Sequence, residues 1–200
     1  MKKLLSVVMV LLLMFTLFSC KRNGQDNQED KNVPNYVIQS ASYEYTDAET
    51  LAEKADLILV GEYTGKSSQM IPDSEKEKEM PSDVYTDYVM NVVKTVKGDI
   101  GDTVNIRMFG GEYNGLVYTR TDNTDFKPGE KYLMYLLKQT TPKTENDIEC
   151  YFLISGGTNC YKIDDSGELE FRGGKSDEDA SKINSLYKSK VDTDALAEKD

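Results

Sequence analysis

Any nucleophilic or metal-binding chemistry in this chain must rest on thiols, hydroxyls and carboxylates, because its 200 residues include no histidine. Ser-His-Asp and Cys-His nucleophile systems need that side chain, and so does an imidazole zinc site. These classes of site are therefore excluded. What remains is chemistry built on 3 cysteines, 13 tyrosines and 35 aspartates and glutamates.

The densest group of carboxylates is Asp164, Asp165, Glu168 and Glu170. A calcium loop of the EF-hand type alternates Asp or Asn ligands and ends on a distal bidentate Glu, a spacing that is absent here. The Asp-Asp-Ser-Gly sequence at 164–167 is typical of a turn. We therefore interpret these carboxylates as the polar residues of a solvated turn and predict no metal site. Two smaller groups have the same interpretation: Asp122 with Asn123 and Asp125, and Asp99 with Asp102.

Other catalytic arrangements find little support. Paired carboxylates can hydrolyse glycosidic bonds. With 35 acidic residues, however, such pairs are expected by chance and do not indicate this activity. The Ser-x-x-Lys spacing of Ser185 and Lys188 falls on a predicted surface helix. The Gly-Gly pairs at 110–111 and 156–157 lack the strand-to-helix context of a phosphate loop. A carboxylate- or metal-dependent hydrolase remains an alternative to a protein without catalytic activity or cofactor.

Cys150 and Cys160 flank the Ser-Gly-Gly at 155–157, which we predict to be a hairpin turn. In an exported chain these two cysteines could form one disulfide. A tight turn would place Leu153, not Cys150, opposite Cys160, so the bridge would need a bulge or a looser loop. The alternative is two half-buried thiols that pack as small apolar groups.

The third cysteine, Cys20, ends a segment with the features of a secretory signal. Lys2 and Lys3 precede an apolar run at 4–18, small Ser19 follows it, and the sequence turns polar after Cys20. A positive start, a short apolar core and a small residue before the cut are typical of such signals. The run is shorter than the roughly 20 residues that a membrane span needs. We therefore predict a signal peptide at 1–19.

The Leu-Phe-Ser-Cys sequence at 17–20 resembles the lipobox of bacterial lipoproteins, although Phe18 is bulkier than usual. The resemblance implies a diacylglyceryl group on the Cys20 thiol, cleavage before Cys20, and a lipid anchor that holds the protein on the cell membrane, outside the cytoplasm. Each buried CH₂ contributes about 0.8 kcal/mol, so two or three chains hold more firmly than one. The alternative is a chance cysteine at the end of an ordinary signal peptide or uncleaved anchor.

Charge limits the partners of the exported part. Without residues 1–19 the chain keeps 22 basic and 35 acidic residues, a net charge of −13. This excess argues against binding of nucleic acid and against binding of anionic lipid through a polybasic segment. We expect a neutral or basic partner. Residues 21–32 include no strongly apolar side chain, which predicts a flexible tether at 20–35 and a folded domain at 36–200.

Apolar alternation and turn residues divide the domain into short strands. We expect strands over 55–63, 84–96, 103–109, 132–137, 151–154 and 160–163. Core candidates are Leu57, Leu59, Ile106, Leu133 and Leu136. This pattern predicts a mainly β fold, a small barrel or sandwich.

Helices are expected at both ends of the domain. A capping box of Thr46 and Glu49 predicts a short helix over 47–54. Ser176 can cap a closing helix whose apolar face includes Ile183. The polar segment 67–82 is expected to be a solvated loop or a short surface helix.

Three segments carry a second resemblance: Ala-Asp-Leu-Ile-Leu-Val-Gly at 55–61, Val-Lys-Gly at 96–98, and Phe-Lys-Pro-Gly-Glu-Lys-Tyr-Leu-Met-Tyr-Leu at 126–136. Together they resemble a recurrent bacterial lipoprotein pattern that is similar to the netrin-like modules, to which the tissue inhibitors of metalloproteinases belong. The resemblance covers about residues 55–171 and implies a small OB-fold-like barrel. Those inhibitors chelate zinc through a free N-terminal cysteine. Here Cys20 is expected to carry lipid and to lie on a tether, so the resemblance implies the fold and not that inhibition.

Tyr85, Tyr113 and Tyr118 are candidates for an exposed ligand face, because OB-folds use a strand face for ligands. The alternative is tyrosines half-buried in the barrel wall. The sequence favours a surface-tethered, non-catalytic binding module for an unknown protein or envelope component. Protease inhibition through a loop such as 67–82 is the other alternative, beside the hydrolase.

Overall fold

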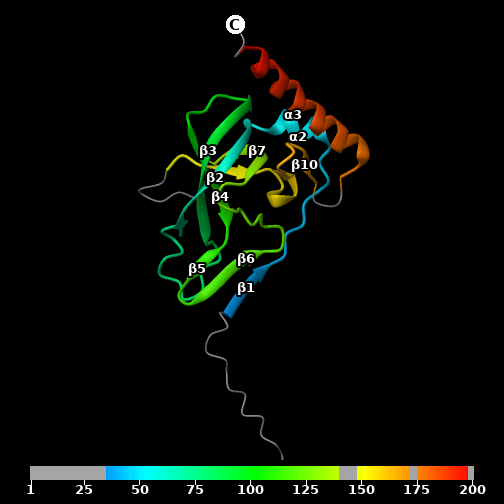
Figure 1. The fold of residues 1–200 in the computed structure, drawn as a ribbon. Coiled ribbons are helices and arrows are strands. Elements are labelled where there is room, and N and C mark those ends of the chain that lie inside the picture. Colours follow the sequence, from blue (N-terminus) through cyan, green and yellow to red (C-terminus); the bar gives the residue numbers. More distant parts are fainter. Residues whose placement is uncertain (1–34, 140–147, 172–174, 198–200) are drawn as a thin grey trace, which may run out of the picture. The chain divides into compact units, whose positions relative to one another are not determined.

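A computed structural model of the protein describes residues 35–139, 148–171 and 175–197. The predicted signal peptide, Cys20 and nearly all of the predicted tether lie outside these residues. The elements in chain order are β1 (Asn35–Gln39), α2 (Ala48–Lys54), β2 (Leu57–Met70), β3 (Tyr85–Lys97), β4 (Thr103–Phe109), β5 (Gly111–Tyr113), β6 (Leu116–Arg120), β7 (Lys131–Lys138), β8 (Tyr151–Leu153), the 3₁₀ turn η1 (Gly156–Asn159), β9 (Cys160–Ile163), β10 (Leu169–Glu170) and α3 (Asp177–Ala197) (Figure 1).

Five strands close into a barrel in the order β2, β3, β4, β8, β7 and back to β2. All neighbours are antiparallel except β4 and β8, which run parallel and pair at Ile106 and Tyr151. The ring closes where Leu136 of β7 pairs with Leu153 of β8. A five-stranded barrel with this connectivity is OB-fold-like. The predicted mainly β fold, with a short helix before the barrel and a helix near the C-terminus, is confirmed.

The side chains of each barrel strand point alternately into the barrel and out of it, and the inward-pointing ones fill the interior. In β4 these are Val104, Ile106 and Met108, all buried. Phe126, from the loop before β7, joins them and contacts three tyrosine rings at centroid distances of 4.9–6.1 Å. Four of the five predicted core residues lie in this interior, and Leu133 lies in a second cluster outside it.

The second cluster lies between the outer face of the barrel and the two helices. Ile58, Leu133 and Tyr161 on the strands pack against Leu51 of α2 and Ile183 of α3. Asp179 of α3 ties the two helices together, because its Oδ1 accepts a 2.8 Å hydrogen bond from the Ala48 amide. In the described part of the chain, no helix combines the length and the apolar composition needed to cross a membrane.

The helix caps differ in part from the prediction. Ser176 caps α3 as predicted, since its hydroxyl accepts from the Asp179 amide at 3.1 Å. The expected capping box at Thr46 is wrong: Asp47 caps α2, and its carboxylate accepts from the Thr50 amide at 2.8 Å. The carboxylate one position later reaches the first helical turn, so α2 begins at Ala48.

A small second sheet, in the order β1, β6, β5, was not predicted. Strands β5 and β6 form a hairpin whose turn residues, Asn114 and Gly115, have φ values of +51° and +74°. β1 runs parallel to β6. The inner face of this sheet packs on the barrel through Tyr118, which contacts Val84 and Phe109.

The hairpin predicted around 155–157 is wrong. β8 and β9 do not pair with each other. Both pair with β7, β9 along Lys131–Met134 and β8 along Leu136–Lys138. η1 connects them, and Gly157 passes so close to Asp122 that an added Cβ would lie 2.1 Å from its carbonyl oxygen. A local turn pattern could not reveal this third strand between the two.

Two loop predictions have mixed outcomes. The turn at 164–167 is confirmed: Asp164 Oδ1 accepts from the amides of Ser166 and Glu168, both at 2.9 Å. The segment 67–82 is a loop only from Ile71 onwards, because its first residues continue β2 to Met70.

Candidate functional site

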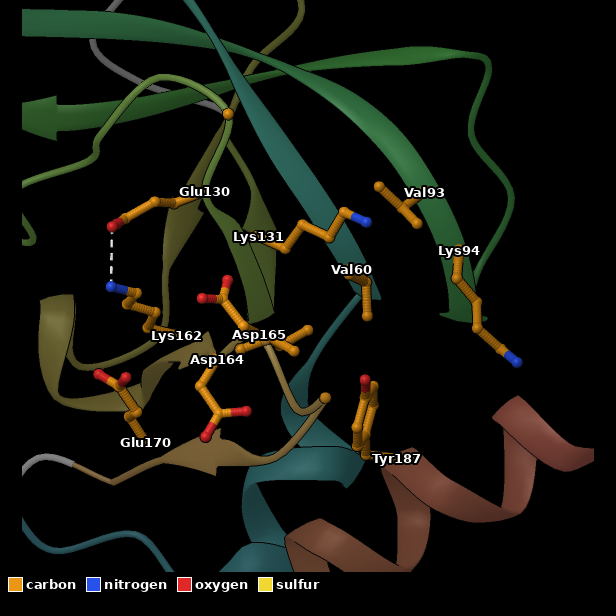
Figure 2. Close-up of a pocket in the computed structure, with 13 residues that line it drawn as sticks. Val60, Val93, Lys94, Glu130, Lys131, Lys162, Asp164, Asp165, Glu170 and Tyr187 are labelled. Carbon is orange, nitrogen blue, oxygen red and sulfur yellow. Dashed lines mark hydrogen bonds and ion pairs between the residues drawn. The ribbon is translucent and has the colours of Figure 1, made fainter.

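A groove of about 870 Å³ lies beside α3, on the outer side of the barrel (Figure 2). Its apolar lining comes from Val60 of β2, Val93 of β3, Ile163 of β9 and Tyr187 of α3. The volume is within the range of about 300–1,000 Å³ that is typical of ligand pockets. Most of the lining belongs to strands and to a hydrogen-bonded turn, so the groove is built on rigid elements.

Charged side chains of both signs line this groove. Lys94 of β3 and Lys131 of β7 lie toward the barrel strands, while Asp164, Asp165 and Glu170 come from the β9–β10 hairpin (Figure 2). Asp165 and Glu170 are exposed. The arrangement gives the groove a basic side and an acidic side, which can orient a polar ligand that carries complementary groups.

An internal ion pair holds one end of the groove. Lys162 Nζ lies 2.7 Å from Glu130 Oε1, and the Tyr132 hydroxyl donates a 2.7 Å hydrogen bond to Glu130 Oε2. The hydrogen bond from Lys162, together with that from Tyr132, holds the pKa of Glu130 below its ordinary value. The same pair raises the pKa of Lys162. Both groups stay charged at neutral pH.

Asp164 and Tyr187 have defined protonation states as well. Hydrogen bonds from Ser166 and then Glu168 lower the pKa of Asp164, which stays a carboxylate. Burial, and then the charge of Glu168, raises the pKa of Tyr187, which stays a neutral phenol. A general acid needs a carboxyl group with a raised pKa, whereas the shifts of Asp164 and Glu130 go the other way. The groove is therefore suited to binding through fixed charges.

Among the residues that the structure describes, no group of three or more cysteine, aspartate and glutamate side chains converges as a metal ion would require. The loop before β7 contains Asp122, Asn123 and Asp125. The side-chain amide of Asn123 donates a 2.7 Å hydrogen bond to the Phe109 carbonyl. Asp99 and Asp102 lie in the turn between β3 and β4.

The three candidate tyrosines lie together in the cluster between the small sheet and the barrel. Tyr118 is only 3% exposed and so cannot belong to an exposed face. Tyr85 and Tyr113 are half-buried: the Tyr85 ring packs on Phe109, and the Tyr113 hydroxyl donates to the Lys76 carbonyl at 2.6 Å. Burial, and then the nearby Asp83, raises the pKa of Tyr85 to about 12. A ligand face at Tyr85 and Tyr113 stays a prediction.

Cys150 and Cys160 are both buried. The β7 register aligns Cys160 with Met134, whereas the Gln139 amide donates to the Cys150 carbonyl. The two cysteines thus lie beside positions of β7 and its extension that are five residues apart, which corresponds to about 16 Å. A disulfide needs Cα atoms within about 7 Å. This geometry favours the alternative, in which each thiol packs separately, Cys160 in the barrel interior and Cys150 against Gln139.

The sequence does not predict the groove, although it does indicate the acidic turn around 164–170 that lines one side of it. Lys94, Lys131 and Asp165 are 71 positions apart at most and come from three different segments. A weak signal exists in the two lysines: Lys94 directly follows an apolar pair in β3, and Lys131 precedes the apolar run of β7. Their convergence follows only from the pairing of β7 with β2 and of β2 with β3.

Comparison with known proteins does not assign the chain to a family. No protein-family model matches it, and no curated protein matches it significantly.

Proposed function

We propose that this chain is an exported lipoprotein that acts as a non-catalytic binding module at the cell envelope. Lipid on Cys20 tethers it to the membrane, and the domain at 36–200 captures a neutral or basic partner. The netrin-like resemblance supports a binding role for the barrel, as the OB-fold type is used mainly for binding. The observation that carries the proposal is the groove with charges of both signs beside α3.

The groove chemistry suits a polar segment of a protein or envelope polymer. Asp165 and Glu170 can accept hydrogen bonds from cationic or amide groups, and Lys131 can donate to carbonyl or carboxylate oxygens. Ile163 and Tyr187, both half-buried, supply apolar area in the same groove. The net charge of −13 after signal removal adds a long-range preference for basic partners.

Capture in the native envelope tests this proposal. The full chain is crosslinked in living cells, and the partner recovered by wild type is compared with that of the double variant Lys131→Ala/Asp165→Asn. Each hydrogen bond to a charged group contributes about 1.5–3 kcal/mol, so we expect at least about a tenfold loss of capture. The matched control is Lys66→Ala/Asp99→Asn, which changes the same two residue types at exposed positions away from the groove. Equal capture by the two double variants would contradict binding at the groove.

The alternative of protease inhibition has one observation in its favour. The loop from Ile71 to Val84 is held at Glu75 by Lys78 and Ser82, and it presents Met80, which is 62% exposed. In the same capture experiment, inhibition predicts a protease as the recovered partner, lost with Met80→Ala and kept with the groove variant. Turnover of the partner that stops when a chelator is added would favour the hydrolase instead.

A further inference from the structure

The small sheet has one face that the rest of the domain does not cover. Its inner face packs on the barrel through Val37 and Tyr118. Tyr36 and Ile38 alternate with Val37 and therefore point the other way, and they are 57% and 64% exposed. The β1–β6 register places Val117 beside Tyr36 on this outer face. Large exposed apolar side chains that are contiguous mark interaction surfaces more often than isolated ones do.

This face also lies where the chain arrives from the predicted anchor. β1 starts at Asn35, 15 positions after Cys20. Fifteen residues reach at most about 50 Å when fully extended. As a flexible coil they span about 20 Å on average. The start of β1 pairs with Leu116, next to the β5–β6 turn (Figure 1), so the predicted tether joins the described domain at this end of the small sheet.

We propose that the outer face of the small sheet, defined by Tyr36, Ile38 and Val117, rests on the bilayer interface. This inference depends on the proposed lipidation of Cys20. Tyrosine has an apolar ring with a polar tip and is enriched at membrane interfaces, and an exposed isoleucine gains by leaving water. Lipid tethering keeps the face near the bilayer at all times, so even a weak contact is populated.

Charge defines which lipid surface fits. Glu112 is exposed on the same face, opposite Val117. With the net charge of −13, this carboxylate disfavours strongly anionic headgroups. The contact should therefore be shallow, apolar, and stronger on zwitterionic than on anionic lipid. It also orients the domain, because one defined sheet face points to the membrane.

The absence of tryptophan allows a direct test. Tyr36→Trp creates a single fluorophore in the full lipidated chain, and Val93→Trp is the matched control at a residue that is 49% exposed on β3. In vesicles of phosphatidylcholine with brominated chains, Trp at 36 should lose most of its emission and shift to shorter wavelength, while Trp at 93 should keep its emission. Adding Ile38→Asp to the Tyr36→Trp variant should restore emission. Replacing half of the lipid with phosphatidylglycerol that carries the same brominated chains should weaken the quenching.

Mass spectrometry of the same vesicle samples separates failure of this inference from failure of the anchor. Lipidated, vesicle-bound protein with Trp at 36 as bright as Trp at 93 would overturn the membrane contact and leave the anchored binding module standing. Unlipidated protein that stays in solution would overturn both. A wavelength shift of Trp at 36 that depends on protein concentration without vesicles would assign the face to a second copy of the chain instead.

Discussion

Asp87 of β3 and Arg107 of β4 form an ion pair that is almost completely removed from water. Their side chains are 4% and 1% exposed, and two hydrogen bonds of 2.6 Å join the guanidinium to the carboxylate. The two residues lie directly opposite each other in the β3–β4 register. Breaking such a buried pair leaves one charge without compensation, which is more costly than losing an exposed pair.

Asp87→Ala should therefore lower the free energy of unfolding by about 3–5 kcal/mol, because it removes the carboxylate that forms two hydrogen bonds with a buried guanidinium. The double change Asp87→Leu/Arg107→Met should cost much less than Asp87→Ala alone. Glu149→Ala is the control: its partner Lys138 and Glu149 itself are more than half exposed, so the loss should stay within about 1 kcal/mol. Denaturant unfolding measures all three. Equal losses of unfolding free energy for Asp87→Ala and Glu149→Ala would show that the buried pair contributes no more to stability than the exposed pair.

Strand alternation places Arg107 correctly on the face opposite Ile106, but it does not predict that this face is buried. Burial depends on residues distant in sequence, beginning with Asp87, which is 20 positions away. The same limit applies to Tyr118, which a local pattern cannot separate from an exposed tyrosine. Side-chain direction follows from a period of two along a strand, whereas burial follows from what packs on top.

The loop between β2 and β3 is fixed by one carboxylate. Glu75 is 6% exposed, and its side chain accepts from the Ser82 amide at 2.8 Å and from Lys78 Nζ at 2.5 Å. These hydrogen bonds, that from Lys78 first, lower the pKa of Glu75 from its ordinary value of 4.5. They stabilise the loop fully above about pH 4.5, and this stabilisation is lost as the pH falls through the lowered pKa.

Acid should thus loosen this loop before the barrel unfolds. We expect the hydrogen-exchange protection of the Ser82 amide, corrected for the intrinsic rate, to fall as the pH drops below about 4.5. In Glu75→Gln the protection should already be low at neutral pH and should vary little with pH. Glu79→Gln, at an exposed position of the same loop, should behave as wild type. Protection that is identical in the two glutamine variants would refute the role of Glu75.

Among the elements, the strands of the barrel were predicted better than those of the small sheet, although the second half of β2 was missed. β3, β4 and β7 have 7 or more residues with turn signals at their ends, and their positions follow from the sequence. β8, with 3 residues, lies where a strand over 151–154 was expected, whereas β5, also with 3 residues, is too short for a reliable alternation. Asn114-Gly115 is a hairpin signal in the sequence, and the expected strands do not include the hairpin that it forms. The parallel β1–β6 pairing joins segments about 80 positions apart and has no local signal.

Across the whole molecule, the barrel could be predicted but the groove could not. A closed five-strand ring follows from apolar strands in a given order, since each must bury one face. The groove lies where β3, β7, the β9–β10 hairpin and α3 meet, so its residues become neighbours only in the folded domain. The charge of the chain is a global property and was read directly from composition.

Both the proposed envelope module and the proposed membrane contact depend on the predicted lipidation of Cys20. Its direct test is the intact mass of the full-length protein after purification from membranes with detergent. We predict a chain that begins at Cys20 and carries a diacylglyceryl group, and we expect Cys20→Ala to leave an uncleaved precursor or to release the protein. An unmodified Cys20 in membrane-bound protein, or mature Cys20→Ala protein that still partitions into detergent, would contradict this prediction.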